Sequence, residues 1–213
     1  MIEVALVAFA TLFATIGPLD VAIVFASLTA AQTRRERIGQ AVKGTAIAAA
    51  ILLAFALFGE AALGLFGISL PALRIAGGIL LLLIAIDMVF ARPSGSTSTT
   101  AEEKAEAEAK ADISVFPLAT PLIAGPGAMG GIVLLMAEGE GDPAYGAVVL
   151  AALAAVLGLA LVLMMVAGEV QRLLGQTGVH VIARIFGVIL AALSVQFMLE
   201  GIANSGLLRG AVS

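Results

Sequence analysis

The chain lacks several residue types on which common protein chemistries depend. Its 213 residues include no cysteine, no tryptophan and one histidine, His180. The absence of cysteine excludes disulfides, thiolate metal sites and thiol nucleophiles, and a lone histidine cannot form a metal site by itself. The sequence therefore predicts no metal site and offers no catalytic residue of these kinds.

Charge is also scarce. Charged residues make up 12% of the chain, 11 basic against 15 acidic, for a net charge of −4 at neutral pH. An average soluble domain carries about a quarter of its residues as charges. The phosphates of nucleic acids require a basic surface, which this composition does not supply. We expect neither a nucleic-acid partner nor a large soluble domain.

Apolar residues dominate instead, at 61% of the chain with a mean hydropathy of +1.13, and they occur in long runs. A helix needs about 20 such residues to cross a bilayer. Hydropathy windows place six spans, at residues 4–30, 44–66, 70–91, 115–136, 144–167 and 182–203. The predicted fold class is an all-α integral membrane protein with six transmembrane helices, surrounded by membrane lipid.

The basic residues of the loops predict the orientation. Eight of them fall in the first, third and fifth loops, on one side of the membrane: Arg34, Arg35, Arg37, Lys43, Arg92, Lys104, Lys110 and Arg172. Only Arg209, near the C-terminus, falls on the other side. Because basic loops stay in the cytosol, we expect both termini outside the cell and a cytosolic linker at 92–112.

Three landmarks recur in the same order, 108 to 110 residues apart, and indicate an internal repeat. They are Gly17-Pro18 and Gly125-Pro126-Gly127, Gly59-Glu60 and Gly168-Glu169, and the Arg-Ile-x-Gly segments that begin at Arg74 and Arg184. A unit of three spans is odd, so its second copy crosses the membrane in the opposite orientation, as in inverted-repeat transporters. We expect two inverted three-helix repeats, 1–91 and 113–213, joined by the 92–112 linker.

Helices 1 and 4 are predicted to be broken at their Gly-Pro motifs, because proline lacks an N–H and glycine permits non-helical backbone angles. Irregular backbone at membrane depth is tolerated only inside the protein or along a cavity. The segments ATIGPLD (14–20) and TPLIAGPGA (120–128) are therefore expected to face each other across a polar cavity. Two plain proline kinks are the alternative. The candidate substrate-binding residues are Gly17, Pro18, Asp20, Thr120, Pro121, Gly125, Pro126 and Gly127.

Asp20 directly follows the first break, just past the middle of span one. An ionised side chain at this depth costs roughly 2.5–3.5 kcal/mol, so it needs a partner or a purpose. Asp20 is a candidate to bind a coupling cation, carry a proton or meet a substrate ammonium. The structural alternative is a buried hydrogen bond to backbone N–H groups that the break sets free.

Further charges lie near the ends of the predicted spans. Glu60 and Arg74 fall at the outer ends of adjacent spans, and Glu169 and Arg184 fall at the inner ends of theirs. Each pair is expected to form a salt bridge. The two pairs are either gates on the two sides of the cavity or structural links between helices. Asp87, late in span three, is expected only to reach the interface.

Three segments resemble the MarC family: FGISLPALRIAGGILLLLIAIDMVF (66–90), FPLATPLIAGPGAM (116–129) and ARIFGVILAALSVQFMLEGI (183–202). The resemblance implies a six-span inner-membrane protein of bacteria or archaea in the wider LysE-like exporter group. Some family members look like ion-driven transporters of glycine and alanine. One departure stands at the first break, where the family often has Asp or Asn before the proline and Gly two places after it, whereas this chain has Gly17 and Asp20.

The leading functional hypothesis is a secondary transporter that moves small neutral amino acids by alternating access around a midplane site. It would need no cofactor and would couple to Na⁺ or H⁺. An exporter or channel for other small solutes is the alternative. The motifs H-E-x-x-H and G-x-S-x-G of hydrolases and the phosphate-binding loop of ATP-driven pumps are absent from the sequence, so no enzyme is predicted. The sequence does not predict the oligomeric state.

Overall fold

The computed structural model describes residues 1–29, 32–90 and 112–205, without the side chains of Ser27 and of residues 167–177, 179, 180 and 183. Every regular element in these ranges is a helix. Five helices are long and apolar enough to cross a membrane, and a bent helix pair would be a sixth crossing if its two parts form one span. The expected all-α membrane fold is therefore confirmed. Most of the predicted 92–112 linker lies outside the described residues, so the division into two repeats and a linker stays a prediction.

The first half of the chain contains one broken helix and two continuous ones. α1 (Ile2–Ile16) ends at Gly17, and α2 (Pro18–Leu28) begins directly after it. α3 (Arg34–Leu65) starts ten residues before the predicted span. Thr33 and Glu36 form a capping box that stabilises a polar first turn ahead of the apolar run. α4 (Leu70–Val89) matches the predicted third span.

The second half repeats this order. η1 (Ser114–Ile123) is a wide-turned helix that meets α6 (Pro126–Glu138) at an angle of 55°. α7 (Pro143–Met165) follows as a continuous apolar helix. α8 (Ala167–Asn204) turns a corner, and its last part, Arg184–Asn204, is the membrane-spanning segment. The predicted breaks in helices 1 and 4 are thus both present.

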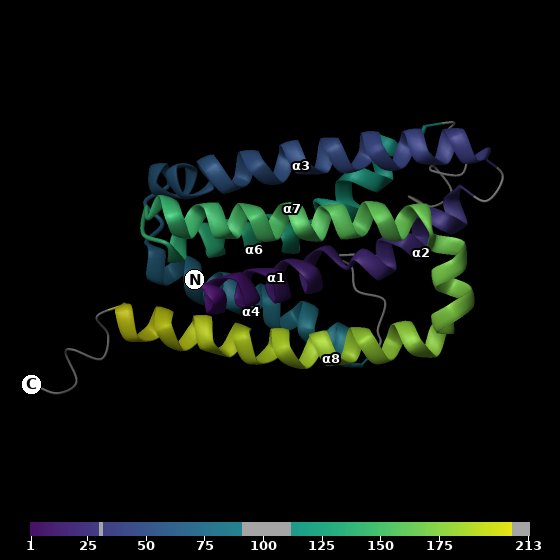
Figure 1. The fold of residues 1–213 in the computed structure, drawn as a ribbon. Coiled ribbons are helices and arrows are strands. Elements are labelled where there is room, and N and C mark those ends of the chain that lie inside the picture. The colour runs from purple at the N-terminus through teal and green to yellow at the C-terminus, as the bar shows by residue number, and fades with distance from the viewer. Residues whose placement is uncertain (30–31, 91–111, 206–213) are drawn as a thin grey trace, which may run out of the picture.

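Neighbouring spans run in alternating directions (Figure 1). We call the end of the bundle where α4 finishes and η1 begins the linker end, and the end where α1 begins and α8 finishes the terminal end. Helices α1, α4 and α7 run toward the linker end, and α3, η1 with α6, and α8 run toward the terminal end. Each half therefore crosses in the opposite sense to the other, while superposition of the halves by a twofold rotation stays a prediction.

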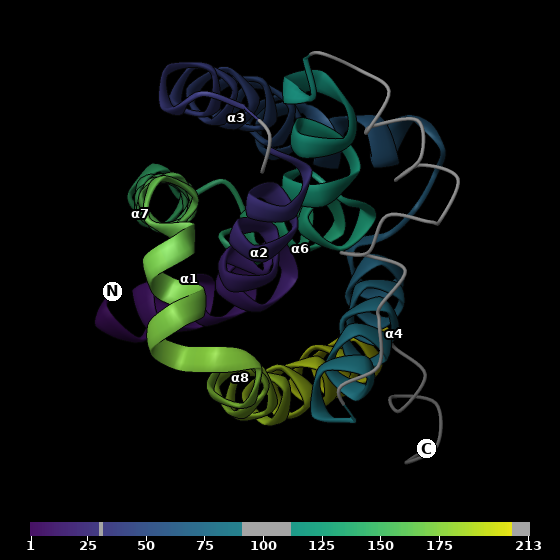
Figure 2. The ribbon, with the colours of Figure 1, turned by 90° about the vertical axis from the view of Figure 1, so that its right-hand side faces the viewer.

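The two broken spans lie next to each other, and the continuous helices pack around them (Figure 2). α3 packs on η1 and α6, and α7 packs on α1 and α2. The most extensive contact joins α4 to α8, where Gly78 comes so close to α8 that a Cβ would lie 2.7 Å from the Ser194 carbonyl oxygen. Small residues allow such close helix approach in lipid. Each half thus covers the broken helix of the other half.

Candidate functional site at the two helix breaks

The first break is a single residue wide. Gly17 has φ 61° and ψ 58°, a left-handed conformation that glycine adopts without the steric cost of a Cβ. Its N–H donates to the Phe13 carbonyl at 3.0 Å, and its own carbonyl accepts from the Val21 N–H at 2.9 Å. Pro18 occupies the first position of α2, where a missing N–H is harmless. The chain therefore ends one helix and starts the next without leaving the membrane-spanning path.

The second break is longer. Phe116 and Thr120 have extended backbone angles inside η1, each directly before a proline, as expected where proline disfavours the helical conformation of the preceding residue. The Ala124 N–H donates to the Ala119 carbonyl at 2.9 Å and closes η1. Gly125 is extended, and Pro126 begins α6. Three prolines and one glycine along the chain thus produce a single bend between η1 and α6.

The two breaks lie at the same level of the bundle. α1 packs against α6, and α2 packs against η1. Both breaks therefore lie where the α1–α6 contact ends and the α2–η1 contact begins. Within the α1–α6 contact, a Cβ on Gly131 would lie 3.7 Å from the side chains of Thr11 and Thr15. We call this contact, made by Thr11, Thr15 and Gly131, the seam. The two broken segments thus lie side by side, and the polar cavity expected between them stays a prediction.

The seam contains a hydroxyl group without a partner. Thr15 Oγ1 donates to the Thr11 carbonyl at 2.8 Å, the usual arrangement for threonine inside a helix. Thr11 Oγ1 is fully buried and makes no hydrogen bond to any described residue. A buried hydroxyl that is left unpaired costs roughly 1–3 kcal/mol. Sequence reasoning missed Thr11, although two threonines four residues apart before a Gly-Pro break are a usable signal of a polar helix face.

The predicted binding residues divide into two groups. Gly17, Pro18, Gly125 and Gly127 are buried, which matches the expectation that the breaks face the protein. Thr120, Pro121 and Pro126 are more accessible, and Thr120 Oγ1 donates to the Val115 carbonyl at 3.3 Å. Around the seam the side chains are packed together, so this conformation is closed there, and the polar cavity stays a prediction for an open conformation.

Asp20 is half-buried in the first turn of α2. A carboxylate in that position is stabilised by the partial positive charge of the helix N-terminus. Asp20 also makes a hydrogen bond or an electrostatic interaction within the protein. A hydrogen bond to freed backbone N–H groups and a role in ion or substrate binding both stay predictions for Asp20.

A second carboxylate lies beside the other break. Asp87 of α4 lines a pocket of about 190 Å³ together with Pro126 and Gly127, whose remaining wall is apolar. Asp87 could not be joined to this break from the sequence, because the two are about 40 positions apart and meet only through the packing of α4 on α6. No group of three or more His, Asp or Glu residues within the described part of the chain could hold a metal ion.

The predicted pairing of Arg74 with Glu60 is wrong. Arg74 donates from Nε and Nη2 to the two carboxylate oxygens of Glu138, at 2.5 and 3.0 Å, and its guanidinium lies 4.0 Å from Glu140. Glu60 is exposed and lines a separate pocket with Asp142. The reason is helix order: α4 packs on α6 and α8, so the basic side chain at its start faces the end of α6.

The pair predicted at the other end is not tested by the structure. The Glu169 side chain lies outside the described residues, and Arg184 is exposed near the start of the last span. A different pair occupies the linker end, where Lys43 Nζ lies 2.6 Å from Asp112 Oδ2. This ammonium, together with hydrogen bonds from Ser114, lowers the pKa of the Asp112 carboxyl to about 2. The pair links α3 to a residue two positions before the start of η1.

Comparisons with known proteins agree on one family. Residues 2–205 match the MarC family of integral membrane proteins. A UPF0056 membrane protein of Methanocaldococcus jannaschii is 41% identical over 197 residues, covering 92% of this chain and 95% of its own. The UPF0056 membrane proteins YvbG of Bacillus subtilis and YhcE of Escherichia coli are 37% and 38% identical over 91% of this chain, and the match covers 92% and 89% of their lengths. No solved structure matches the chain.

Proposed function

The chain belongs to the MarC family of integral membrane proteins, and we propose that it is a secondary transporter of small neutral amino acids such as glycine and alanine. The observation that carries this proposal is the placement of two broken spans side by side, with their breaks at one level of the bundle. Broken helices near the midplane are the usual substrate sites of secondary transporters. A pair of ordinary proline kinks would not need to meet.

The chemistry of the breaks supports a zwitterionic substrate. The N-termini of α2 and α6 both begin at the breaks, and helix N-termini attract anions through free N–H groups and the helix dipole. In our proposal they receive the substrate carboxylate. Asp20 meets the substrate ammonium or a coupling Na⁺ or H⁺, because it is the charged side chain that immediately follows the first break.

The seam provides the moving part of the proposed mechanism. Thr11, Thr15 and Gly131 separate the two breaks from the terminal end, and the seam is closed in this conformation. Opening it would expose the Thr11 hydroxyl, which has no partner among the described residues. A substrate that hydrogen-bonds Thr11 would compensate that group, so substrate binding would favour separation of α1 from α6.

The Arg74–Glu138 pair fits the role of a gate at the terminal end. It joins α4 to the last residue of α6, so it must break or move with α6 if the seam opens. A purely structural link between the two helices is the simpler function of the same contact. Transport assays distinguish these two roles. If the pair is a gate, a variant of it changes the rate of substrate exchange even under conditions where it is as stable as the wild type. If the pair is only a structural link, the rate is unchanged under those conditions.

We propose that the protein lies in the inner membrane with the linker end in the cytosol. Arg34, Arg35, Arg37 and Lys43 all lie at that end, in or near the first turns of α3, in agreement with the positive-inside rule. The reversed directions of the two halves support an inverted repeat. The twofold relation would give both breaks equivalent access from opposite sides of the membrane.

Counterflow in proteoliposomes tests the proposed function. Vesicles loaded with unlabelled alanine or glycine should accumulate the labelled compound transiently, and imposed Na⁺ and H⁺ gradients should reveal the coupling ion. Thr11→Val should weaken substrate affinity about fivefold, the equivalent of one hydrogen bond of about 1 kcal/mol. Thr29→Val is the matched control, because Thr29 is buried but bonds the Phe25 carbonyl of its own helix.

The counterflow results test the role of the seam, the mode of transport and the substrate class separately. Saturable counterflow with a selective loss in Thr11→Val supports an amino acid carrier that uses the seam. Equal losses in Thr11→Val and Thr29→Val would remove the seam from the binding site. Conductance without counterflow would indicate a channel, and the absence of both for alanine and glycine would contradict the substrate class.

A further inference from the structure

A further pocket lies at the linker end, apart from the seam. It has a volume of about 530 Å³ and is formed by α2, α3 and the end of α7. Among the described residues, its wall combines the side chains of Arg34 and Arg37 with apolar side chains of the three helices. Binding pockets for small ligands usually measure about 300–1,000 Å³, so the space is large enough for the polar headgroup of a lipid.

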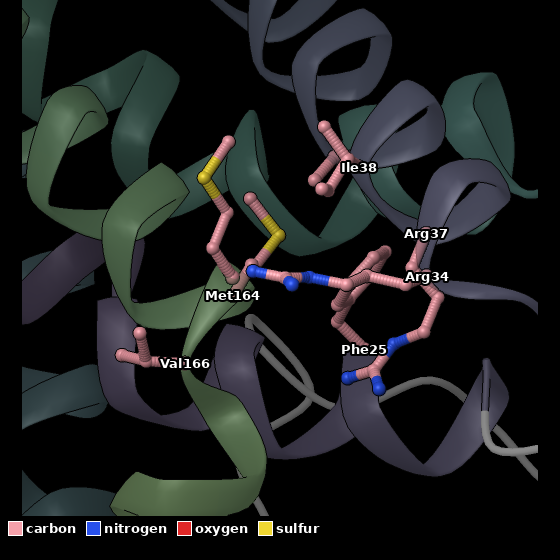
Figure 3. A pocket seen from close by; sticks show the side chains of 8 residues that line it. Phe25, Arg34, Arg37, Ile38, Met164 and Val166 are labelled. Atoms are coloured by element: carbon pink, nitrogen blue, oxygen red, sulfur yellow. The ribbon is translucent and has the colours of Figure 1, made fainter.

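The two arginines give the pocket a positive charge that no carboxylate of the described residues compensates. Both guanidinium groups extend from α3 into the pocket (Figure 3). The lining contains no carboxylate, and neither arginine forms an ion pair within the described part of the chain. Like charges one helical turn apart destabilise a helix. An anion between the two side chains would remove this repulsion.

The acidic residue between the arginines is already engaged. Glu36 accepts hydrogen bonds from the backbone N–H and the hydroxyl group of Thr33, at 2.8 and 2.7 Å. These bonds close the capping box at the start of α3. Glu36 therefore serves the helix end, and the charge of Arg34 and Arg37 is left for another anion.

The remaining wall is apolar and continues to the outer surface. Phe25 and Met164 are buried at the inner side of the pocket, whereas Met165, Val166 and Ile38 are exposed on the outside of the bundle. An exposed apolar surface of a membrane protein faces lipid tails. The pocket thus combines a site for an anion with an apolar path toward the bilayer.

We propose that this pocket binds the headgroup phosphate of an anionic phospholipid from the cytosolic leaflet, with the acyl chains lying along Met165, Val166 and Ile38. Arginine recognises phosphate through strong charge-assisted hydrogen bonds, and basic pockets between helices on the cytosolic side suit such headgroups. The bound lipid would connect α2, the second half of the first broken span, to α3 and α7. It would stabilise this closed conformation of the bundle.

Lipid titration of the full-length protein in neutral detergent tests the proposal. Dioleoylphosphatidylglycerol, dioleoylphosphatidylcholine and inorganic phosphate are added separately, and binding is followed by native mass spectrometry and by the temperature of thermal unfolding. We expect a saturable complex with one phosphatidylglycerol and a higher unfolding temperature. Phosphatidylcholine and inorganic phosphate should give neither effect at the same concentrations.

Variants locate the site. Arg37→Gln should weaken phosphatidylglycerol binding at least tenfold, whereas Arg35→Gln should change it less than twofold, because Arg35 carries the same charge on the same turn but does not line the pocket. Ile38→Glu is the second test variant. It places a carboxylate beside the arginines at an exposed position, so it should abolish lipid binding while the protein stays folded.

Three results would overturn the proposal. Equal weakening by Arg35→Gln and Arg37→Gln would show general attraction to a basic surface. Equal binding of phosphatidylcholine would show that the anionic headgroup is not recognised, and equal binding of inorganic phosphate would assign the pocket to a free anion. None of these results depends on the transport assay, so they leave the proposed function unaffected.

Discussion

Arg74 and Glu138 join α4 to α6 through two hydrogen bonds, and their side chains are only 7% and 14% exposed. Removing one partner of such a pair leaves the other charge without compensation, at a cost of about 3 kcal/mol. We expect Glu138→Gln to lower the temperature of thermal unfolding in detergent by about 6–12 °C. The double variant Arg74→Met/Glu138→Leu should recover most of this loss.

The matched control for Glu138 is its neighbour Glu140. The Glu140 side chain is 75% exposed and lies 4.0 Å from Arg74, so it contributes as a surface charge, at less than about 1 kcal/mol. Glu140→Gln should therefore leave the unfolding temperature almost unchanged. Similar losses in the two variants would show that net acidity near Arg74, and not the specific hydrogen bonds, stabilises this end of the bundle.

The Lys43–Asp112 pair predicts a pH dependence of stability. The pKa of the Asp112 carboxyl falls from 3.8 to about 2 in the folded protein, so the folded state favours the ionised form. The pair stabilises the fold above about pH 4, and this contribution is lost as the pH falls toward 2. Both side chains are about half exposed, which keeps the effect small.

Lys43→Gln tests this dependence. The variant should be slightly less stable than the wild type at pH 6, and the difference in unfolding temperature should shrink as the pH is lowered through 4 toward 3. A carbon-13 titration of the Asp112 carboxyl should show a higher pKa in the variant. A stability difference that is independent of pH would mean that Lys43 acts through packing alone.

For single residues, the sequence predicted the positions of unusual backbone conformation better than it predicted which side chains contact each other. Gly17 and Gly125 were predicted from local backbone chemistry, which needs no knowledge of the neighbouring helices. The partner of Arg74 depends on which helices pack together, and adjacency along the chain favoured Glu60 over Glu138. Asp87 was expected only to reach the interface, because its place beside the second break depends on the packing of α4 on α6. Thr11 was missed although the Thr11–Thr15 spacing indicates a polar helix face, since its neighbour Gly131 comes from α6.

At the scale of helices, the α4–α8 contact depends on the absence of side chains. A Cβ on Gly78 would lie 2.6 Å from Met198 Cγ and 2.7 Å from the Ser194 carbonyl oxygen. Because backbone cannot yield as a flexible side chain can, Gly78→Ala should separate the helices and cost about 1–3 kcal/mol. The expected result is a lower unfolding temperature in detergent.

Gly158 in α7 provides the control for Gly78. A Cβ on Gly158 would meet nothing within 4 Å, and alanine has the higher helix propensity by up to about 1 kcal/mol. Gly158→Ala should leave the unfolding temperature unchanged or raise it slightly. If both alanine variants lost stability equally, the cost would lie in helix flexibility and not in the α4–α8 contact.

Helix positions could be predicted largely because lipid imposes them. Every predicted span overlaps an observed helix or helix pair, since an apolar run of about 20 residues has few alternatives in a bilayer. The misses concern what lies beyond the apolar runs. The early start of α3 depends on the capping box at Thr33, and the corner of α8 lies in a polar stretch where hydropathy carries no information.

At the scale of the whole molecule, the absence of cysteine makes the orientation measurable by single-cysteine labelling. Ala144→Cys lies at an exposed position of the terminal end, near the start of α7. Ser96→Cys lies in the predicted cytosolic linker. A membrane-impermeant maleimide should label Ala144→Cys in intact cells and Ser96→Cys only after the membrane is opened, and the reverse pattern would contradict the predicted orientation.

A disulfide across the seam between the two broken spans tests whether transport requires α1 and α6 to separate. Thr15→Cys/Gly131→Cys places two thiols across it, because a Cβ on Gly131 would lie 3.7 Å from Thr15 Oγ1. Oxidation to the disulfide should hold α1 against α6, and labelled alanine counterflow should stop in the oxidised protein and return after reduction. Undiminished counterflow with a complete disulfide would contradict alternating access through this seam.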